Sequence, residues 1–595
     1  MLFRQSWFAA VCVAIALGNA PPVFAQTAAP SGAGSATAMQ VTPDQAAFQA
    51  ANAQLQPDKR AAALTAFLHD FPTSKRADRA RSILLKLLLE QQPLDEKRIH
   101  QVAKARVDAA EKTSRANVEN GVAYSLAEAP PNGVDLKSAE AWARDSVKQT
   151  TLPAMAAMMF GSAPAKPLTP AEQAKRDAQV KRYFGESQAA NLQTLADVYL
   201  HEGKISDAIA ALDQAQPLYP TQGATFLTRG QIEHLQHQDD KAVDDLELAT
   251  IYGGMTPAGQ ALLQSLYAAQ HGGDRAGLEA EIDRRYRALY QPRPASQHSA
   301  PTSGRTVLLA LYTGSACDPC AAADLATDGV LEQYSRSQVV ALAFDQHIPE
   351  PDPLANTASV ARAAYDNVRF TPTFRIDGVE GPEIGGGRED AEEAYKTLSA
   401  ELDKELQVPS GATLHVAAGF APDHTVAAKA EFQVADADAL RKLLSQAAKP
   451  DVASSDPAAT AAPAAAAKTP KLVLNFALVQ REVRYSGENG IRFHAVVVRD
   501  LARPTADALP VALTGSSSAS AAFDPATISS KLSKYLADFA QYNERFGTAH
   551  FLSTDTTLPL DQLAVAAWVE DLSSHKVVAA AYAPLGDAPL QQAAR

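Results

Sequence analysis

Two cysteines, Cys317 and Cys320, stand close together in the stretch TGSACDPCAA, residues 313–322. A pair at this spacing can crosslink the chain, hold a metal ion or exchange disulfides with another molecule. As a crosslink it would contribute only about 2 kcal/mol, because the loop that it closes is so short. Structural zinc needs about four ligands, and the sequence has no second cysteine pair. The spacing therefore favours a redox centre, with no metal site.

The residues around the pair place it where thiols become reactive. TVLLALYT, residues 306–313, reads as a buried strand, and a short turn then leads to Cys317, which we expect to open a helix. Backbone N–H groups and the helix dipole at that end stabilise a thiolate, which predicts Cys317 as the nucleophile. Cys320 lies one turn further on and can attack a mixed disulfide to release the product. Pro319 presets φ in the first helical turn.

A second motif follows in TPTFRIDG, where Thr371 and Pro372 precede an apolar strand. A cis peptide bond fits a turn at that place. Strand and helix patterns alternate from residue 304 to residue 408, which predicts an α/β domain over that range. A linker at 291–303 precedes it.

The two motifs together resemble a thioredoxin-fold domain over about residues 304 to 406. The resemblance implies that Pro372 is cis and packs beside the disulfide, and that the Thr371 backbone pairs with an extended substrate peptide. It also implies thiol–disulfide exchange on a protein client without any diffusible cofactor. The sequence departs from better-known members in having Ala316 where a Trp precedes the first cysteine, and Leu311 where a buried acid stands.

Charge near the pair bears on its redox direction. Asp318 lies between the cysteines, and its carboxylate opposes the thiolate that the helix start favours. This favours a reductase or isomerase over a strong oxidase. Asp345 and His347 end the second strand, at the sheet edge where Cys317 must lie. Two interpretations stay open for both residues: they shuttle a proton to the cysteines, or they are loop residues that cap the following segment or meet water.

Residues 42–290 are almost continuously helical in pattern. The clearest unit, ANLQTLADVYLHEGKISDAIAALDQAQPLYP, has large and small residues at the spacing of a tetratricopeptide repeat (TPR). Ala196 and Ala208 allow its two helices to approach, while Tyr199 and Leu212 fill the groove between them. Stacks of such repeats bind a protein partner on their concave face, or act as a spacer.

The chain from 409 to 595 shows alternating apolar and polar residues with turn signals, which predicts an antiparallel β-sandwich of the immunoglobulin-like kind. An Ala/Pro-rich linker at 446–470 interrupts it. The fold class expected is therefore multidomain: a helical TPR-like solenoid, an α/β thioredoxin fold and a β-sandwich.

The beginning of the chain and its charge indicate the compartment and exclude some partners. Arg4, an apolar run and the residues up to Ala25 predict a signal peptide at 1–25, followed by a flexible leader at 26–41. We expect export to the periplasm or the extracellular medium, and no transmembrane segment, because no apolar run is long enough. A net charge of -13 argues against nucleic acid as a partner.

Three functions fit these patterns. The first is an exported thiol–disulfide oxidoreductase acting on protein disulfides, with the repeats recruiting a partner. The second is a protein-binding scaffold with a catalytically weak thioredoxin-like domain. The third is a dithiol that binds a soft ion such as Cu(I), since two-coordinate thiolate sites need no further ligand.

Overall fold

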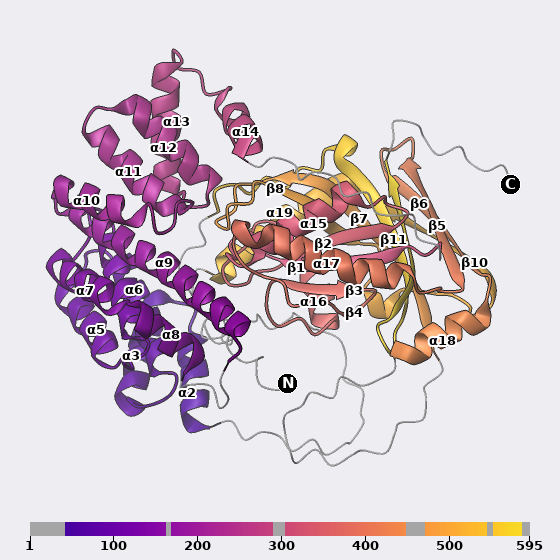
Figure 1. Ribbon diagram of the computed structural model, residues 1–595, viewed down its shortest axis with the longest axis horizontal. Coiled ribbons are helices and arrows are strands. Elements are labelled where there is room, and N and C mark those ends of the chain that lie inside the picture. The colour runs from indigo at the N-terminus through magenta and orange to yellow at the C-terminus, as the bar shows by residue number, and fades with distance from the viewer. Residues whose placement is uncertain (1–41, 162–167, 290–303, 448–469, 544–550, 586–595) are drawn as a thin grey trace. The chain divides into compact units, whose positions relative to one another are not determined.

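The computed structural model describes residues 42–161, 168–289, 304–447, 470–543 and 551–585 (Figure 1). The predicted signal peptide, the leader, the linker at 291–303 and most of the linker at 446–470 lie outside these residues. The chain forms two compact units. The first runs to Ile282 and includes Phe539–His550, and the second comprises the rest.

The first unit is helical, which confirms the fold predicted for residues 42–290. Its helices are α2 Pro43–Asn52, α3 Pro57–Asp70, α4 Ala77–Glu90, α5 Glu96–Asp108, α6 Arg115–Ala127, α7 Leu136–Gln149, α8 Leu152–Phe160, α9 Pro170–His201, α10 Ile205–Ala215, α11 Gly223–Leu235, α12 Asp239–Ile251, α13 Pro257–Gln270 and α14 Leu278–Leu289, whose end belongs to the second unit.

Helices α9 and α10 pair, as do α11 and α12, and small residues lie where the helices meet. Ala196 and Ala208 are fully buried, and Leu212 fills the space beside them. At Gly230 an added Cβ would lie 2.9 Å from the Leu246 side chain, so only glycine permits this approach. The helical hairpins expected from the repeat pattern are therefore present.

The second unit contains all strands of the described chain. Its elements are β1 Val307–Thr313, α15 Cys320–Gln333, β2 Val339–Asp345, α16 Thr357–Tyr365, β3 Thr373–Ile376, β4 Val379–Glu380, η1 Arg388–Asp390, α17 Ala391–Leu406, β5 Ala412–Phe420, β6 Val426–Val434, α18 Ala437–Ala447, β7 Leu472–Arg484, β8 Phe493–Leu501, η2 Thr505–Asp507, β9 Leu509–Pro510, β10 Gly515–Phe523, α19 Pro525–Asn543, η3 Leu560–Gln562, β11 Leu563–Asp571 and β12 Val577–Pro584.

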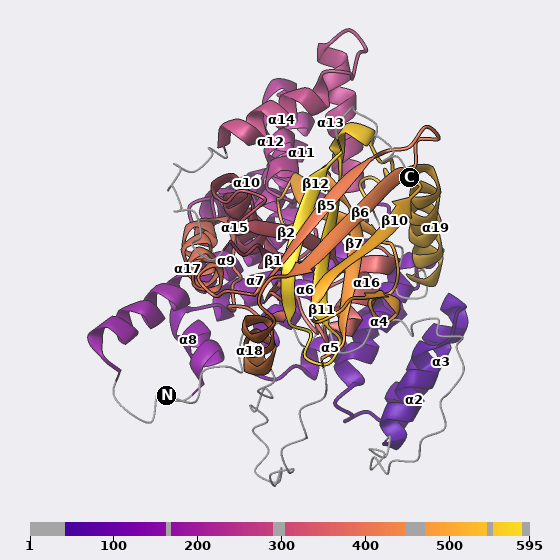
Figure 2. The ribbon, with the colours of Figure 1, turned by 90° about the vertical axis from the view of Figure 1, so that its right-hand side faces the viewer.

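A nine-stranded mixed sheet forms the centre of this unit (Figure 2). Its order is β12-β11-β7-β8-β2-β1-β3-β4, and β9 pairs with β7. β1 and β2 are parallel, with Val307 opposite Val339 and Thr313 opposite Asp345. Every residue of these two strands is buried, because helices or other strands cover both faces, as is usual for parallel strands.

A smaller antiparallel sheet of order β10-β6-β5 lies against part of the large one. Burial alternates along β6, so one face of this sheet is turned to the core. Phe432 from β6 shares that core with Phe476 from β7 and Val565 from β11. The antiparallel alternation expected after residue 409 is thus present in β5 and β6.

Five of the strands after residue 409, namely β7, β8, β9, β11 and β12, belong to the same sheet as β1 and β2. β8 pairs in parallel with β2 at Val497 and Ala343, which joins β7, β8, β11 and β12 to the sheet of β1 and β2. Trp568 and Val498 share one hydrophobic core with Leu309. The segments 304–408 and 409–595, which the sequence patterns separate, therefore lie in one compact unit, since the apolar edge of β2 is covered by β8.

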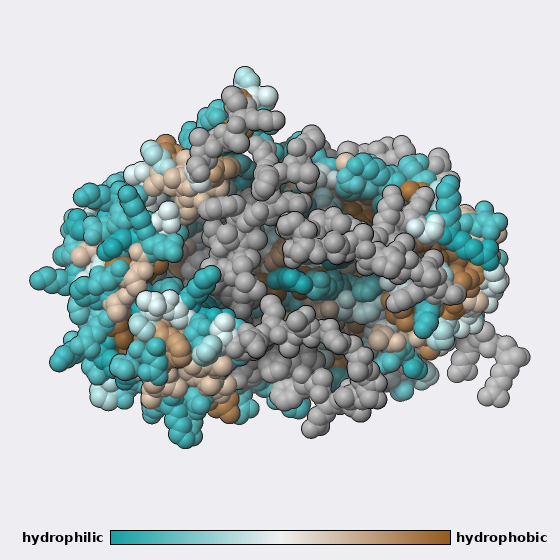
Figure 3. Space-filling view, turned by 90° about the horizontal axis from the view of Figure 1, so that it is seen from below, coloured by the Kyte–Doolittle hydropathy of each residue, from teal (hydrophilic) through white to brown (hydrophobic). Residues whose placement is uncertain are grey.

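In the face drawn in Figure 3, hydrophobic residues are scattered among polar ones. None of the described helices combines the length and apolar character that crossing a membrane requires.

Candidate functional site

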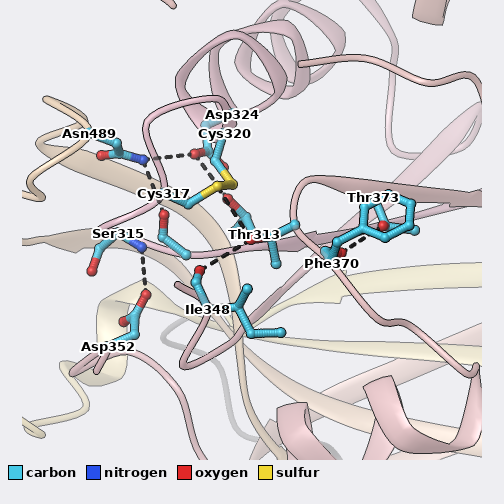
Figure 4. Close-up of a disulfide and its surroundings, with 12 residues drawn as sticks. Thr313, Ser315, Cys317, Cys320, Asp324, Ile348, Asp352, Phe370, Thr373 and Asn489 are labelled. Atoms are coloured by element: carbon cyan, nitrogen blue, oxygen red, sulfur yellow. Dashed lines mark hydrogen bonds between the residues drawn. A yellow bond between two sulfur atoms is a disulfide. The ribbon is translucent and has the colours of Figure 1, made fainter. Parts of the chain in front are cut away.

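The cysteine pair lies in the turn between β1 and α15 (Figure 4). β1 ends at Thr313, and α15 begins at Cys320 with Pro319 as its N-cap. We expected Cys317 to open the helix, but it lies in the turn before it. Its carbonyl oxygen accepts a hydrogen bond from the Cys320 N–H at 2.9 Å, an i to i+3 bond that is tighter than the α-helical pattern.

Cys317 and Cys320 are joined by a disulfide, with Cα atoms 5.2 Å apart. The exposed fraction is 1% for Cys317 and 0% for Cys320. The residues beside them are more open, since Ala316 and Pro319 are half-buried and Asp318 is exposed. The disulfide therefore lies directly beneath the surface, and the Asp318 carboxylate lies next to it.

Thr371 contacts the disulfide from the loop before β3. Its Oγ1 lies 3.3 Å from Cys317 Sγ and 3.1 Å from the Ile348 carbonyl oxygen, and these two atoms compete for its single proton. The peptide bond between Thr371 and Pro372 is cis. The hydroxyl is thus placed where it can donate a hydrogen bond to Cys317 Sγ, both in the disulfide and in a thiolate of the reduced protein.

Pro372 lies beside the cysteine turn. An added Cβ on Gly385 would lie 3.5 Å from Pro372 Cγ and 3.4 Å from the Pro319 carbonyl oxygen, so Gly385 touches both prolines. The structure therefore brings four of the predicted site residues together, and they are Cys317, Cys320, Thr371 and Pro372.

Asp345 ends β2 opposite Thr313 and is 1% exposed. Within the described chain neither of its carboxylate oxygens has a hydrogen-bond partner. Burial raises the pKa of Asp345 well above its ordinary value, repulsion from Asp352 adds to this, and attraction to Arg499 opposes it. Asp345 is thus poised to hold a proton, but no contact links it to either sulfur.

His347 is held by its neighbours through both ring nitrogens. Nδ1 accepts a hydrogen bond from the Asp352 backbone N–H at 2.9 Å, so the proton of the neutral ring resides on Nε2 and is donated to the Tyr535 hydroxyl at 3.0 Å. Burial lowers the pKa of His347 to about 3. The geometry fits a loop cap, the second of the two interpretations of this residue, and the shuttle role stays a prediction.

Further carboxylates lie beneath the cysteine turn. Asp352 accepts a hydrogen bond from the Ser315 N–H. Burial raises the pKa of Asp352 to about 6, although this hydrogen bond acts to lower it. Asp324, on α15 one turn after Cys320, accepts from Thr313 Oγ1 at 3.1 Å. Burial raises the pKa of Asp324 well above its ordinary value, and the neighbouring carboxylates add to this shift. Negative charge is therefore disfavoured on this side of the disulfide.

The loop between β7 and β8, residues 485–492, covers the turn from the other side (Figure 4). The Asn489 N–H donates to the Ser315 carbonyl oxygen at 3.0 Å, and Asn489 Nδ2 donates to the Gly314 carbonyl oxygen at 3.3 Å. Nδ2 also lies 3.4 Å from Asp324 Oδ2. At Gly487 an added Cβ would lie 2.6 Å from the Ser315 oxygen, so this close approach requires glycine.

Exposed acidic residues from neighbouring loops interact electrostatically with one another near Asp318. Partial burial raises the pKa of Glu488, in the β7–β8 loop, to about 7, and repulsion from Glu350 and Asp318 adds to the shift. These carboxylates come from three different loops. The Asp318 carboxylate, which stands between the cysteines, is the one expected to oppose a thiolate at Cys317.

Sequence reasoning missed Asn489, Arg499, Asp324 and Asp352. Asp324 could have been found, because a spacing of four residues from Cys320 places both on one helix face. Asn489 and Arg499 carried no signal, since they reach the site only through the pairing of β8 with β2. The described chain holds no group of three or more His, Cys, Asp or Glu side chains that could bind a metal ion.

Comparisons with known proteins give no family for this chain. No family model and no curated protein matches it. A solved structure described as Assembly Chaperone of RpL4 (Acl4), residues 1–338, is 16% identical, with a TM-score of 0.26, over 42% of this chain and 90% of that one. A tetratricopeptide repeat protein from Parabacteroides merdae is 12% identical, with a TM-score of 0.14, over 37% of this chain and 99% of that one. At these scores neither likeness carries an argument about this protein.

Proposed function

We propose that the protein is a thiol–disulfide oxidoreductase that acts on protein disulfides through Cys317 and Cys320. The observation that carries the proposal is the disulfide before α15, directly beneath the surface, with the Thr371 hydroxyl 3.3 Å from Cys317 Sγ. A buried crosslink of so short a loop would contribute little to stability. Reactivity accounts better for a pair placed at a helix start and contacted by a hydroxyl donor.

The order of the elements supports a thioredoxin-like assignment for the segment from β1 to α17. A strand, a helix, a second parallel strand and a helix lead to the hairpin of β3 and β4 and a last helix. β1 lies between β2 and β3 in the sheet. The proposal includes a sandwich-like packing of the β10-β6-β5 sheet on the neighbouring strands, which rests on their shared core.

Each half-reaction follows from the two sulfurs. In the reduced protein, the Cys317 thiolate attacks one sulfur of a client disulfide, a mixed disulfide forms, and one client thiolate leaves and takes a proton. Cys320 then loses its proton and attacks the Cys317 sulfur, which releases the second client thiolate. The client gains two electrons as its disulfide becomes a dithiol, and the protein pair loses two as its disulfide forms.

The charges around the pair support a reductase or isomerase. The start of α15 stabilises a thiolate, whereas an ionised Asp318 carboxylate next to the pair opposes it. Burial raises the pKa of Asp318, and Glu488, with a pKa of about 7, adds only part of a negative charge at neutral pH. A thiolate that is less stabilised makes the reduced form less favourable and the pair less oxidising.

The helical hairpins of the first unit supply surfaces of the kind that bind proteins, and the proposal assigns them the recruitment of a partner. It also includes export to the periplasm or the extracellular medium, which rests on the sequence up to Ala25 alone. An exported compartment would supply the client disulfides.

Trapping of a mixed disulfide tests the proposal. The Cys320→Ala variant retains the attacking sulfur and lacks the resolving one, so its adduct with a disulfide-bonded peptide should accumulate and be visible by mass spectrometry. The matched Cys317→Ala variant should accumulate far less, because the Thr371 hydroxyl that can stabilise a thiolate contacts Cys317 Sγ. Equal trapping by both variants, or none by either, would overturn the proposal and favour a binding scaffold.

A further inference from the structure

Residues from the β7–β8 loop contact the cysteine turn directly, although they lie far along the chain from it. The Asn489 side chain is 7% exposed and donates from Nδ2 to the Gly314 carbonyl oxygen at 3.3 Å. Its backbone N–H donates to the Ser315 carbonyl oxygen at 3.0 Å. One residue thus binds two consecutive carbonyl groups just before Cys317.

The opposite side of the same turn is held as well. The Ser315 N–H donates to the Asp352 carboxylate, and Asp352 is in turn fixed by the Leu354 N–H at 2.7 Å. The peptide groups of the turn are therefore bonded on both sides. The stretch that presents Cys317 to Cys320 has little freedom to move while these bonds persist.

Asn489 itself is locked in place. Its Oδ1 accepts a hydrogen bond from the Ile491 N–H at 3.0 Å, which leaves the amide NH2 pointing at the turn. Gly487 brings the loop backbone against Ser315, where any larger residue would collide. The loop is shaped to contact this turn closely.

The geometry points to Asn489 as a positioning residue of the redox pair, which holds the turn before Cys317 in the conformation that the disulfide requires and thereby sets the dithiol–disulfide equilibrium. This inference rests on the proposed function. Disulfide geometry is demanding, so bonds that hold the turn closed favour the disulfide over the more mobile dithiol. Loss of the Asn489 bonds shifts the equilibrium toward the dithiol.

The test measures the equilibrium of the full chain with dithiothreitol, in which the protein disulfide becomes a dithiol as dithiothreitol is oxidised to its cyclic disulfide. In Asn489→Ala the equilibrium constant should rise by about threefold to tenfold, the range for one lost hydrogen bond. Gly487→Ala should also raise the equilibrium constant, because the added methyl group pushes the loop away from Ser315. This second variant tests the inference if Asn489→Ala fails to fold.

Ser486→Ala is the matched control. Ser486 accepts a hydrogen bond from Arg492 at 2.6 Å within the same loop. If the turn contacts set the equilibrium, this variant keeps the wild-type constant. An unchanged constant in both Asn489→Ala and Gly487→Ala, or an equal shift in Ser486→Ala, would overturn the inference. A wild-type pair that does not exchange at all would instead overturn the proposed function.

Discussion

Thr371 is the side chain whose chemistry bears most directly on the cysteine sulfur. Its hydroxyl lies 3.3 Å from Cys317 Sγ, and a hydrogen bond to a thiolate is stronger than one to a neutral thiol. In the reduced protein the same hydroxyl would stabilise the nucleophile. The Thr371 hydroxyl and the start of α15 would therefore both stabilise a Cys317 thiolate, whereas the Asp318 carboxylate would destabilise it.

Replacing Thr371 by Val removes this donor at nearly constant volume. In the reduced protein, the pH midpoint for alkylation of Cys317 by iodoacetamide should rise by about 1, since hydrogen bonds to charged groups are worth about 1.5 kcal/mol or more. Thr373→Val is the matched control, because Thr373 Oγ1 donates to the Phe370 carbonyl oxygen at 2.8 Å. A midpoint that moves equally in both variants would contradict this role.

At the scale of residues, local patterns identified the cysteine pair and the turn beside it, but little of the environment around them. Cys317, Cys320 and the Thr371–Pro372 turn could be identified because each motif is contiguous. The environment of His347 could not, because Tyr535 and the Asp352 backbone, which hold its ring, become neighbours only on folding.

Among the elements of the first unit, helices α9 and α11 share a buried carboxyl group. Asp197 on α9 accepts hydrogen bonds from Thr228 on α11 and from Gln193 on its own helix. Burial raises the pKa of Asp197 to about 8, repulsion from Glu128 adds to this, and the two hydrogen bonds oppose it. The folded unit therefore prefers this group protonated at neutral pH.

This preference predicts a stability that falls as the pH rises. The folded state keeps the Asp197 proton up to about pH 8, whereas the unfolded chain loses it near its ordinary pKa of 3.8. Between these values the free energy of unfolding should fall by at most about 1.4 kcal/mol per pH unit from this group. Hydrogen-exchange protection of the backbone amides in α9 and α11, measured at several pH values, reports this fall in the free energy of unfolding.

The variant Asp197→Asn should lose this part of the pH dependence and gain protection relative to the wild type above pH 8. Asp213→Asn is the control, since Asp213 is exposed and paired with Arg229. Protection with the same pH slope in the wild type and Asp197→Asn would rule out the assignment.

At the scale of elements, periodicity predicted the helices of the first unit and the strands β1 and β2. It placed the start of α15 three residues too early, because the tight turn at Cys317 and the helix that follows share one sequence pattern. The pairing of β8 with β2 could not be predicted, since nothing in either apolar strand specifies its neighbour.

Over the whole molecule, the segment from β1 to α17 and the later strands lie in one compact unit. Val498 and Trp568 lie in the same core as Leu309, and β8 covers the outer edge of β2. The boundary that the sequence patterns place between residues 408 and 409 runs through this core. Turn and linker residues mark where strands end, but they do not show which strands pair with each other.

A fragment of residues 304–408 should therefore fail to melt cooperatively, whereas residues 283–595 should melt in a single cooperative transition. The shorter fragment loses the apolar cover of β2 and exposes an unpaired strand edge. Circular dichroism of both fragments during heating measures this. A cooperative transition of the short fragment at the midpoint of the long one would contradict the single core.

The reduction potential of the Cys317–Cys320 pair tests the central claim most directly. The protein is equilibrated in dithiothreitol and glutathione buffers, and free thiols are trapped and counted by mass. The account predicts reversible exchange with a potential between about −270 and −180 mV, the range from thioredoxin to protein disulfide isomerase. A pair that stays oxidised in excess dithiothreitol, while the protein remains folded, would contradict it.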